Sequence, residues 1–161
     1  MKQKLLISAA TAAAIYIAAP LIELVEGVEN KPYMDIAGIP TVCSGITGPD
    51  VVWGKTYSNR ECRNLLDKHI KIHGKHVQNA ITYPIEPETR AALISFSYNV
   101  GGSAMRKSTA VRLINQGKVE QGCKALGMWN KARVNGKLKV VKGLVNRRSD
   151  EIKLCLSGLQ R

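Results

Sequence analysis

A run of 18 uncharged residues near the start of the chain, from Leu5 to Ile22, constrains its folding more than any other feature. A membrane-spanning helix needs about 17–25 mostly apolar residues, so this run only just reaches the lower limit. Seven of its residues are alanine, and Ser8, Thr11 and Pro20 reduce its hydrophobicity further. The segment is therefore long enough to engage the secretion machinery but poorly suited to stay in lipid.

Two lysines, Lys2 and Lys4, precede this run. Because Lys and Arg are enriched on the cytoplasmic side of membrane segments, they predict a cytoplasmic N-terminus and export of the rest of the chain. Four fates of the segment are compatible with the sequence: a signal peptide cleaved after Ala14 or Ala19, a stable anchor, a buried helix of a soluble protein, or an uncleaved segment that enters the membrane and later leaves it. We treat residues 1–22 as a weakly hydrophobic signal-anchor segment and residues 23–161 as the folded domain.

The formal net charge of +12 indicates a polyanionic partner: nucleic acid, a membrane surface or a bacterial envelope. The sequence has no zinc-finger, basic-zipper or RNA-recognition signature, and the export segment also argues against nucleic acid. We therefore expect no nucleic acid partner. Lys and Arg are spread along the chain with a local excess from Lys131 to Arg148, which we interpret as a solvated basic surface.

The four cysteines, Cys43, Cys62, Cys123 and Cys155, include no C-x-x-C pair of the kind found in zinc sites. An even number of cysteines in an exported chain favours two disulfides over buried free thiols. Three pairings are possible, and proximity along the chain favours Cys43 with Cys62 and Cys123 with Cys155.

The positions of glycine and proline residues and the spacing of apolar residues indicate an α+β fold. A helix reaches Glu26 and ends at Gly27, and two short apolar runs around Asp35-Ile36-Ala37-Gly38 predict a β-hairpin that extends to Cys43. Ser58 and Glu61 form a capping box that begins a helix extending to about Val77. Further helices are expected over residues 88–100, 108–116, 119–126 and 145–156.

Glu26, Asp35 and Thr41 are the candidate catalytic residues. Cleavage of a glycosidic bond needs a carboxylic acid that protonates the leaving oxygen and a second carboxylate that stabilises the sugar cation or activates a water. Glu26 ends a helix and Asp35 lies on the hairpin, so the two can face each other across a cleft. Thr41, on the second strand, can share a face with Asp35 and hold a water by its hydroxyl. From these residues alone, ordinary surface carboxylates remain the alternative.

The pattern Glu26-Gly27, Tyr33-x-Asp35 and Gly38-x-x-Thr41-x-x-x-Gly45 resembles the active-site segment of the phage-type lysozymes, glycoside hydrolase family 24. The resemblance continues through blocks at residues 43–62, 92–101 and 108–109, and through 129–132 and 143–151 at the C-terminal end. Together with the weak N-terminal span and the cysteine positions, it is similar to the signal-arrest-release endolysins of lambdoid phages. Ser44 departs from the pattern, because many relatives have His there. Residues 1–22 contain no cysteine, so activation by disulfide exchange within that segment is not available.

The resemblance implies a lysozyme-like α+β fold, with a small N-terminal β-hairpin lobe, a larger helical C-terminal lobe and a cleft between them. It implies an inverting endolysin that hydrolyses the β-1,4 bond between N-acetylmuramic acid and N-acetylglucosamine in peptidoglycan. Glu26 is then the acid, and Asp35 with Thr41 activates the water. Glu26 is expected to be partly buried in the cleft, because it must carry a proton.

The expected partners are peptidoglycan and, through residues 5–22, the bacterial inner membrane. The enzyme is expected to act as a monomer without cofactor or metal. It is expected to be held inactive in the host inner membrane before its release into the periplasm. A lytic transglycosylase and a non-catalytic wall-binding module are the alternative functions.

Several other polar or aromatic residues have predicted roles. Asn99 is expected to contact substrate or brace the cleft, with helix capping as the alternative. Arg147, Arg148 and Glu151 are expected to form a structural ion-pair cluster. We interpret three histidines as residues on the face of a helix rather than as a metal site: His69, His73 and His76. We interpret Trp53 and Trp129 as packing residues rather than as platforms on which sugars stack.

Overall fold

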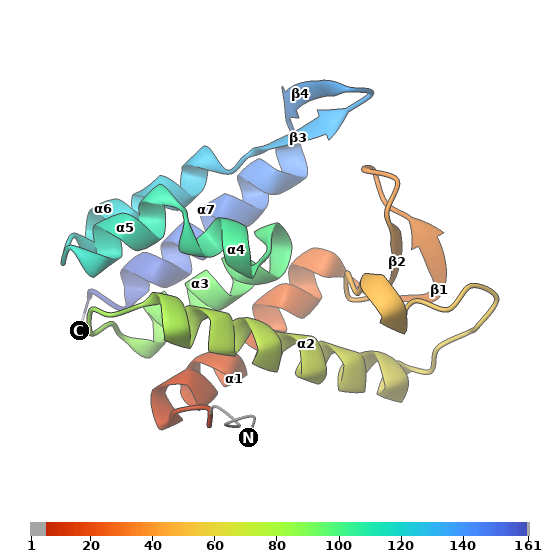
Figure 1. The fold of residues 1–161 in the computed structure, drawn as a ribbon, viewed down its shortest axis with the longest axis horizontal. Coiled ribbons are helices and arrows are strands. Elements are labelled where there is room, and N and C mark those ends of the chain that lie inside the picture. The colour runs from red at the N-terminus through yellow and green to blue at the C-terminus, as the bar shows by residue number, and fades with distance from the viewer. Residues whose placement is uncertain (1–5, 161) are drawn as a thin grey trace.

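Helix α3 (Pro87–Val100) is the buried centre of the structure, a computed structural model that describes residues 6–160. Residues 91–97 of this helix are all buried, on every side of it. Helices α1 (Ala9–Glu26), α2 (Asn59–Ala80) and α7 (Lys142–Ser157) pack around α3, as Figure 1 shows. A helix enclosed in this way has no polar face, which explains its nearly continuous apolar and small-residue sequence.

Helix α1 contains most of the uncharged N-terminal run and packs one face of it against the core. It begins at the N-cap Ser8 and ends at Gly27, the predicted end. Its inner face is formed by Ala14, Ala18 and Ile22, which have 0% exposure, and the small alanines let α1 approach α3 closely. The predicted boundary after residue 22 therefore lies within one continuous helix. The lysines at positions 2 and 4 lie outside the described residues.

The outer face of α1 remains apolar although it faces solvent. Tyr16 is 84% exposed and Leu24 is 79% exposed. Within residues 6–160, α1 is the one helix long and apolar enough to cross a membrane, and only 22% of its span is buried. Apolar residues all around a half-exposed helix are unusual for a soluble domain, but they are what a bilayer-spanning segment requires.

The small lobe is the predicted hairpin, β1 (Glu29–Met34) and β2 (Pro40–Cys43), followed by the short 3₁₀ helix η1 (Gly48–Asp50). The antiparallel register pairs Tyr33 with Thr41 and Met34 with Pro40. A small core lies beneath the hairpin and comprises Val42, Cys43, Ile46, Tyr57 and Cys62.

The large lobe is helical, as predicted. The capping box of Ser58 and Glu61 begins α2. After α3 come α4 (Gly102–Arg106), α5 (Thr109–Asn115), α6 (Val119–Ala125) and the 3₁₀ helix η2 (Leu126–Met128). Two disulfides, Cys43–Cys62 and Cys123–Cys155, have the pairing favoured by chain proximity. The first ties the hairpin to α2 and the second ties α6 to α7.

A second hairpin, β3 (Lys131–Val134) and β4 (Lys137–Val140), projects from the large lobe and was not expected from the sequence. Its turn is Asn135-Gly136, with φ of 51° and 78°. An Asn-Gly pair, in which both residues tolerate a positive φ, is the typical sequence signal of a tight hairpin. This hairpin could therefore have been predicted from the sequence. Helix α7 begins at Lys142, three residues earlier than predicted.

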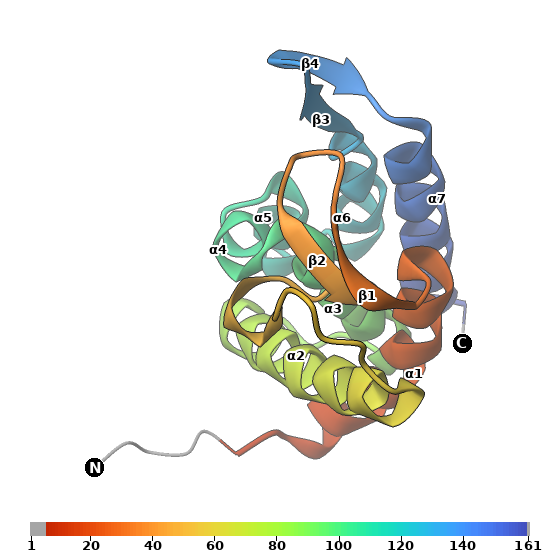
Figure 2. The same ribbon diagram turned by 90° about the vertical axis from the view of Figure 1, so that its right-hand side faces the viewer.

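The two tryptophans differ in their environments. Trp129 packs edge-on against Phe96, with ring centroids 5.5 Å apart, as the packing interpretation predicts. The same interpretation is wrong for Trp53, which is 57% exposed in the loop after η1. Figure 2 shows the α+β arrangement from the side, with β3 and β4 at the top and the first hairpin below them, in front of the helices.

Candidate active site

Glu26 lies at the C-terminal end of α1, where the two lobes meet. Its side chain is 21% exposed and forms an ion pair with Arg147 of α7 through Oε1. Its other carboxylate oxygen lies against Gly45, where a Cβ atom would come within 2.6 Å of Oε2. The φ of Gly45 is 69°, which also disfavours other residues. Glycine at position 45 thus makes room for the Glu26 carboxylate.

Arg147 is held by groups other than Glu26. Its Nε donates to Glu151 Oε1 at 3.2 Å, and its Nη2 donates to the Ser95 carbonyl at 3.1 Å. Glu151 has 0% exposure, and it also accepts a hydrogen bond from the Ser95 hydroxyl at 2.8 Å. An arginine fixed in this way acts as a rigid support for the Glu26 carboxylate.

Arg148 completes the buried cluster predicted from the sequence. Its Nε lies 3.2 Å from Glu151 Oε2, and its guanidinium lies over the Phe96 ring at 5.0 Å from the ring centroid. Burial lowers the pKa of Arg148 to about 10. Burial raises the pKa of Glu151, although the two arginines oppose this shift. Removal of one member would leave an unpaired buried charge, so the cluster locks α7 to α3.

Two tyrosines lie near the Glu26 carboxylate. Tyr98 of α3 donates from its hydroxyl to the Ser44 carbonyl at 2.6 Å, which connects the large lobe to the loop beside Gly45. Burial, and next the negative charge of Glu26, raise the pKa of Tyr98. The pKa of Tyr33 is also raised, first by burial and then by Glu26, Glu29 and Asp35. Tyr33 is therefore within electrostatic reach of both candidate carboxylates.

Asp35 begins the turn of the first hairpin. Its Oδ1 accepts hydrogen bonds from the backbone N–H groups of Ala37 and Ile39, both at 2.8 Å. Its Oδ2 has no hydrogen bond to any group in residues 6–160. One oxygen thus fixes the turn, and the other is free to accept a proton or a hydrogen bond from outside the chain.

Thr41 lies on the same face of the hairpin as Tyr33 and Asp35, because it is directly opposite Tyr33. It is 3% exposed, and its hydroxyl donates to the Ile39 carbonyl at 2.9 Å. Since the proton of the hydroxyl is engaged, the oxygen can act only as an acceptor toward a further partner.

A pocket of about 420 Å³ opens beside Glu26. Val25 and Glu26 line it from α1, Ile36 from the turn of the first hairpin, and residues between 141 and 150 from the start of α7. The pocket therefore lies between the hairpin lobe and the helical lobe, where a cleft was predicted.

The family model described as phage lysozyme matches residues 23–151 of the chain. An SAR-endolysin of Pseudomonas phage phiKMV is 44% identical over 131 residues, which are 81% of this chain and 81% of the relative. The chain belongs to the phage lysozyme family. An SAR-endolysin of Enterobacteria phage P21 is 43% identical over 135 residues, 84% of this chain and 79% of the relative.

Solved structures give the same result. The endolysin from Escherichia coli O157:H7 phage FAHEc1 superimposes with a TM-score of 0.80 at 30% identity, over 97% of this chain and 96% of that one. The lysozyme-like α+β fold is thus confirmed. This phage lysozyme is a glycosidase, a peptidoglycan-hydrolysing endolysin with an N-terminal signal-anchor segment, as the sequence predicted.

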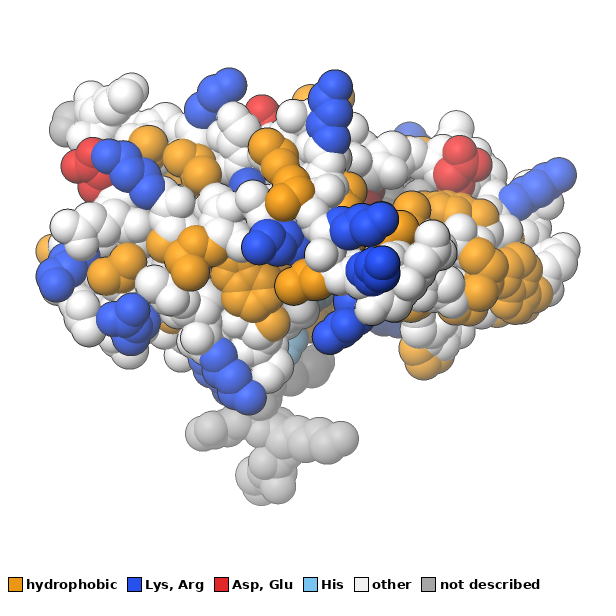
Figure 3. Space-filling view, turned by 90° about the horizontal axis from the view of Figure 1, so that it is seen from above, with side chains coloured by type: hydrophobic (Ala, Val, Ile, Leu, Met, Phe, Trp, Pro, Cys, Tyr) orange, Lys and Arg blue, Asp and Glu red, His pale blue; other side chains and the backbone are white. Residues whose placement is uncertain are grey.

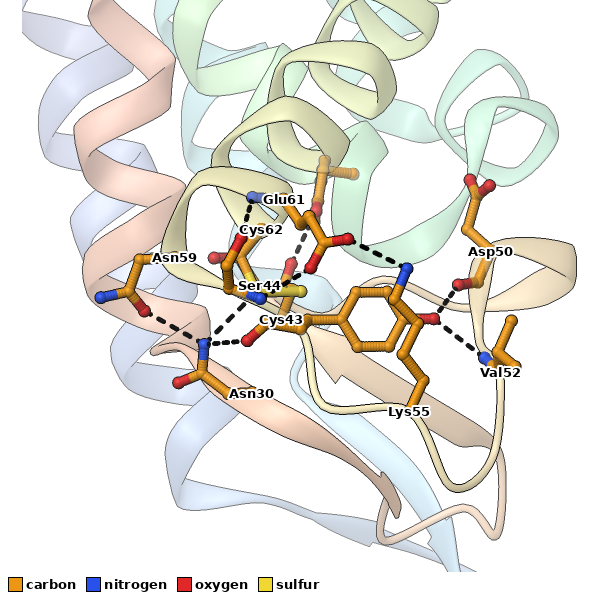
Figure 4. The surroundings of a disulfide bond; sticks show 12 residues. Asn30, Cys43, Ser44, Asp50, Val52, Lys55, Asn59, Glu61 and Cys62 are labelled. Atoms are coloured by element: carbon orange, nitrogen blue, oxygen red, sulfur yellow. Dashed lines mark hydrogen bonds and ion pairs between the residues drawn. A yellow bond between two sulfur atoms is a disulfide. The ribbon is translucent and has the colours of Figure 1, made fainter.

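The disulfide Cys43–Cys62 positions the hairpin lobe of this lysozyme, as Figure 4 shows. Around it, Asn30 Nδ2 donates to the Tyr57 carbonyl at 2.8 Å and to Asn59 Oδ1 at 3.0 Å. The Tyr57 hydroxyl donates to the Asp50 carbonyl at 2.5 Å. These bonds join β1, the loop after β2 and the start of α2, so the hairpin is fixed at its base.

The remaining candidates are structural in their contacts. Asn99 accepts a hydrogen bond from Arg148 through Oδ1, which supports the bracing role; its contact with substrate stays a prediction. His69 pairs with Asp50 at 2.9 Å, and His73 bonds to the Ser97 hydroxyl at 2.8 Å. Within residues 6–160, no group of three or more His, Cys, Asp or Glu side chains is placed to hold a metal ion.

The pairing of Arg147 with Glu26 was not predicted from the sequence. The two residues are 121 positions apart, and no local pattern connects them. The available signal was the position of two arginines and Glu151 on the apolar face of α7. Charged residues on such a face predict a buried cluster, but they do not identify what the cluster supports.

Proposed function

We propose that Glu26, Asp35 and Thr41 catalyse inverting hydrolysis of the β-1,4 bond between N-acetylmuramic acid and N-acetylglucosamine. The observation that carries this proposal is the position of the Glu26 carboxylate. It lines a pocket between the lobes and is supported by Arg147, and Ile36, which follows Asp35 in the turn of the first hairpin, lines the same pocket. An inverting glycosidase needs an acid on one side of the sugar and a base that activates water on the other.

Glu26 acts as the general acid. It donates its proton to the glycosidic oxygen as the bond to the anomeric carbon breaks. In the free enzyme Arg147 stabilises the carboxylate. Substrate that fills the pocket excludes water from the surroundings of this carboxyl group. Because Arg147 is fixed by Glu151 and Ser95, the acid keeps its position in both protonation states.

Asp35 and Thr41 hold the attacking water. The free Oδ2 of Asp35 accepts one proton of the water, and Thr41, whose own proton is engaged with Ile39, accepts the other hydrogen bond. A water that donates to two acceptors directs a lone pair away from them, toward the anomeric carbon. The new C–O bond forms on the face opposite the leaving group, and Asp35 takes the released proton.

The signal-anchor helix controls assembly of this site. Helix α1 has 18 residues, about 27 Å at 1.5 Å per residue, close to the thickness of the hydrocarbon core. While it lies in the inner membrane with its N-terminus in the cytoplasm, Ala14, Ala18 and Ile22 are withdrawn from the core. Glu26 is then held at the membrane surface, away from Arg147. Release into the periplasm lets α1 pack against α3 and completes the site.

The substitution Glu26→Gln tests the acid. It keeps the shape of the side chain and removes the proton donor, so we expect loss of lysis of purified peptidoglycan with unchanged circular dichroism. Lysis at the wild-type rate would refute the assignment. Mass spectrometry of wild-type products separates the alternative: hydrolysis leaves a reducing end, whereas a lytic transglycosylase leaves an anhydro end.

Substitution of exposed alanines in α1 tests whether this helix holds the inactive enzyme in the membrane. Ala9, Ala12 and Ala13 are exposed, so Leu at these positions makes the span more hydrophobic without disturbing the core. We expect the triple Leu variant to stay in the membrane fraction without lysing cells. The matched triple Ser variant should be released and active. Full lysis by the Leu variant while it remains membrane-bound would contradict the control mechanism.

A further inference from the structure

The β3–β4 hairpin carries a group of basic side chains that the proposed reaction does not use. Residues 131–142 contain no acidic residue. All the basic residues of this segment are exposed: Lys131, Arg133, Lys137, Lys139 and Lys142. We call this set the basic hairpin.

These charges have no compensation within residues 6–160. None of the five side chains forms an ion pair there, and only Arg133 makes a side-chain hydrogen bond, to the Gly136 carbonyl at 3.5 Å. Some exposed lysines elsewhere in the described part of the chain have acidic partners, such as Lys68 with Asp50 and Lys124 with Glu120, and others, such as Lys71, do not. An uncompensated group of like charges opposes folding slightly and favours an anionic partner.

The register of the hairpin presents cations on both faces. Each basic residue of one strand is opposite an apolar residue of the other: Lys131 with Val140, Ala132 with Lys139, Arg133 with Leu138 and Val134 with Lys137. Because opposite residues share a face and successive residues alternate, each face carries two cations that are not directly opposed. This arrangement avoids direct repulsion and spreads positive charge around the whole hairpin.

The basic hairpin borders the site. Val141, Gly143 and Leu144, which follow β4, line the pocket beside Glu26. The four-residue strands extend about 13 Å, at some 3.3 Å per residue. Figures 1 and 2 both place this hairpin above the first hairpin. Seen from above in Figure 3, basic side chains gather in the middle of the face with hydrophobic side chains between them.

We infer that the basic hairpin binds carboxylates of the peptide stems on the glycan strand that lies in the cleft. This inference rests on the proposed function. A glycan strand whose lactyl groups are joined to peptides has no charge of its own. The carboxylates of the peptides therefore supply the negative charge that the basic hairpin can attract. The hairpin is thus a specificity element for peptide-bearing strands.

An anionic lipid surface is the rival partner, because Leu138 and Val140 are exposed among the cations. Two observations favour the peptide stems. The hairpin adjoins the pocket that contains Glu26. It also projects from the side of the molecule opposite the start of α1, the helix proposed to lie in the membrane before release, as Figures 1 and 2 both show.

The experiment compares two enzymes on two substrates. The hairpin variant combines Lys131→Gln, Arg133→Gln, Lys137→Gln and Lys139→Gln. One substrate is purified peptidoglycan, and the other is the same material with its carboxylates converted to neutral methylamides by carbodiimide coupling. We expect kcat/KM of the variant to fall about tenfold on the native substrate, since four exposed ion pairs contribute modestly each. On the amidated substrate, the wild type and the variant should be equal.

The matched control removes four other exposed, unpaired cations: Arg60, Lys71, Lys118 and Lys153. It should retain at least half of wild-type activity on both substrates. An equal loss by the hairpin variant on both substrates, or no loss, would overturn the inference. So would a loss of cosedimentation with phosphatidylglycerol vesicles without a change in hydrolysis, which would assign the hairpin to lipid. If the wild type cleaved neither substrate, the proposed function itself would fail.

Discussion

The two hairpins of this lysozyme adjoin the same pocket, through Ile36 in the first turn and Val141 after β4, but they are held in different ways. The β1–β2 hairpin is fixed by the Cys43–Cys62 disulfide, by a small core and by the hydrogen bond from Tyr98 to the Ser44 carbonyl. The β3–β4 hairpin is exposed along both strands and is held mainly by its own backbone pairing and by its connection to α7. The first hairpin is therefore the more rigid of the two, as the proposed water-holding role requires, and the second carries the exposed positive charge that the proposed substrate contact requires.

This difference separates chemistry from substrate capture. A catalytic base has to keep its position to within a fraction of an ångström, and Asp35, the proposed base, is fixed by two backbone hydrogen bonds. Long-range electrostatic attraction by lysines does not require their side chains to be fixed in position.

The largest expected effect comes from Asp35→Asn at the turn of the first hairpin. The amide oxygen can still accept the backbone hydrogen bonds, but the side chain can no longer take a proton from water. We expect kcat to fall by about 10²–10⁴, the usual contribution of a general base, with unchanged stability. Lys137→Gln, beside the turn of the second hairpin, should change kcat less than about twofold. Similar losses from both substitutions in steady-state assays would remove the distinction between the hairpins.

Loss of the hairpin disulfide is the next largest effect. Cys43→Ser with Cys62→Ser opens a 19-residue loop and should lower the free energy of unfolding by about 3 kcal/mol. Loss of Cys123–Cys155, with a separation of 32 residues, should cost about 4 kcal/mol by the same reasoning. Denaturant titration measures both values. At a temperature where both variants are folded, only the first should lose kcat, because only the first anchors the Asp35 lobe.

Acidification should destabilise the contact between His73 and Tyr98, which helps to hold the first hairpin. Burial, with smaller contributions from His76 and His69, lowers the pKa of His73 to about 4. His73 contacts Tyr98, whose hydroxyl donates to the Ser44 carbonyl beside Gly45. The unfolded chain binds a proton below about pH 6.5, whereas the folded protein does not until about pH 4, so stability falls as the pH falls through this window.

The expected loss between pH 7 and pH 4 from this one group is about 2–3 kcal/mol, at 1.36 kcal/mol per pKa unit. His73→Gln removes the titrating group and should make the free energy of unfolding less dependent on pH in this range. Urea titrations of both proteins at pH 7, 5 and 4 measure the difference. Identical pH profiles would show that His73 does not contribute.

The smallest effects come from a matched pair of glycines, one near each hairpin. Gly45 and Gly136 both have positive φ, 69° and 78°, so Ala should cost about 1–2 kcal/mol of stability at either position. Only at position 45 would the new methyl group also contact Glu26 Oε2. We therefore expect Gly45→Ala to lower kcat about tenfold and Gly136→Ala to leave it nearly unchanged. Equal activities of the two variants would contradict the close fit between Gly45 and the Glu26 carboxylate.

Local patterns in the sequence predicted most of the fold. The Ser58–Glu61 capping box, the end of α1 at Gly27 and the first hairpin depend on neighbouring residues, and the structure confirms them. The Asn135-Gly136 turn was equally local, but the surrounding lysines were interpreted only as a basic surface. The position of Trp53 was predicted wrongly, because burial of a loop residue depends on the path of the loop.

The contacts within the site could be predicted less well from the sequence. Glu26, Asp35 and Thr41 are named by a family pattern, and their roles stay predictions. Packing brings Arg147 to Glu26, and neither residue carries a local signal of this contact. The same is true of Gly45, whose proximity to Glu26 appears only in three dimensions. Long-range pairs of this kind follow from the arrangement of helices, which no short segment encodes.

The anomeric configuration of the first product tests the account most directly. If Asp35 and Thr41 hold a water opposite Glu26, cleavage of the β-linked strand releases N-acetylmuramic acid with an α-configured reducing end. Proton NMR during the first minutes of hydrolysis, before mutarotation, measures this configuration. We expect the α-anomer as the initial product. An initial β-anomer, or an anhydro end, would contradict it.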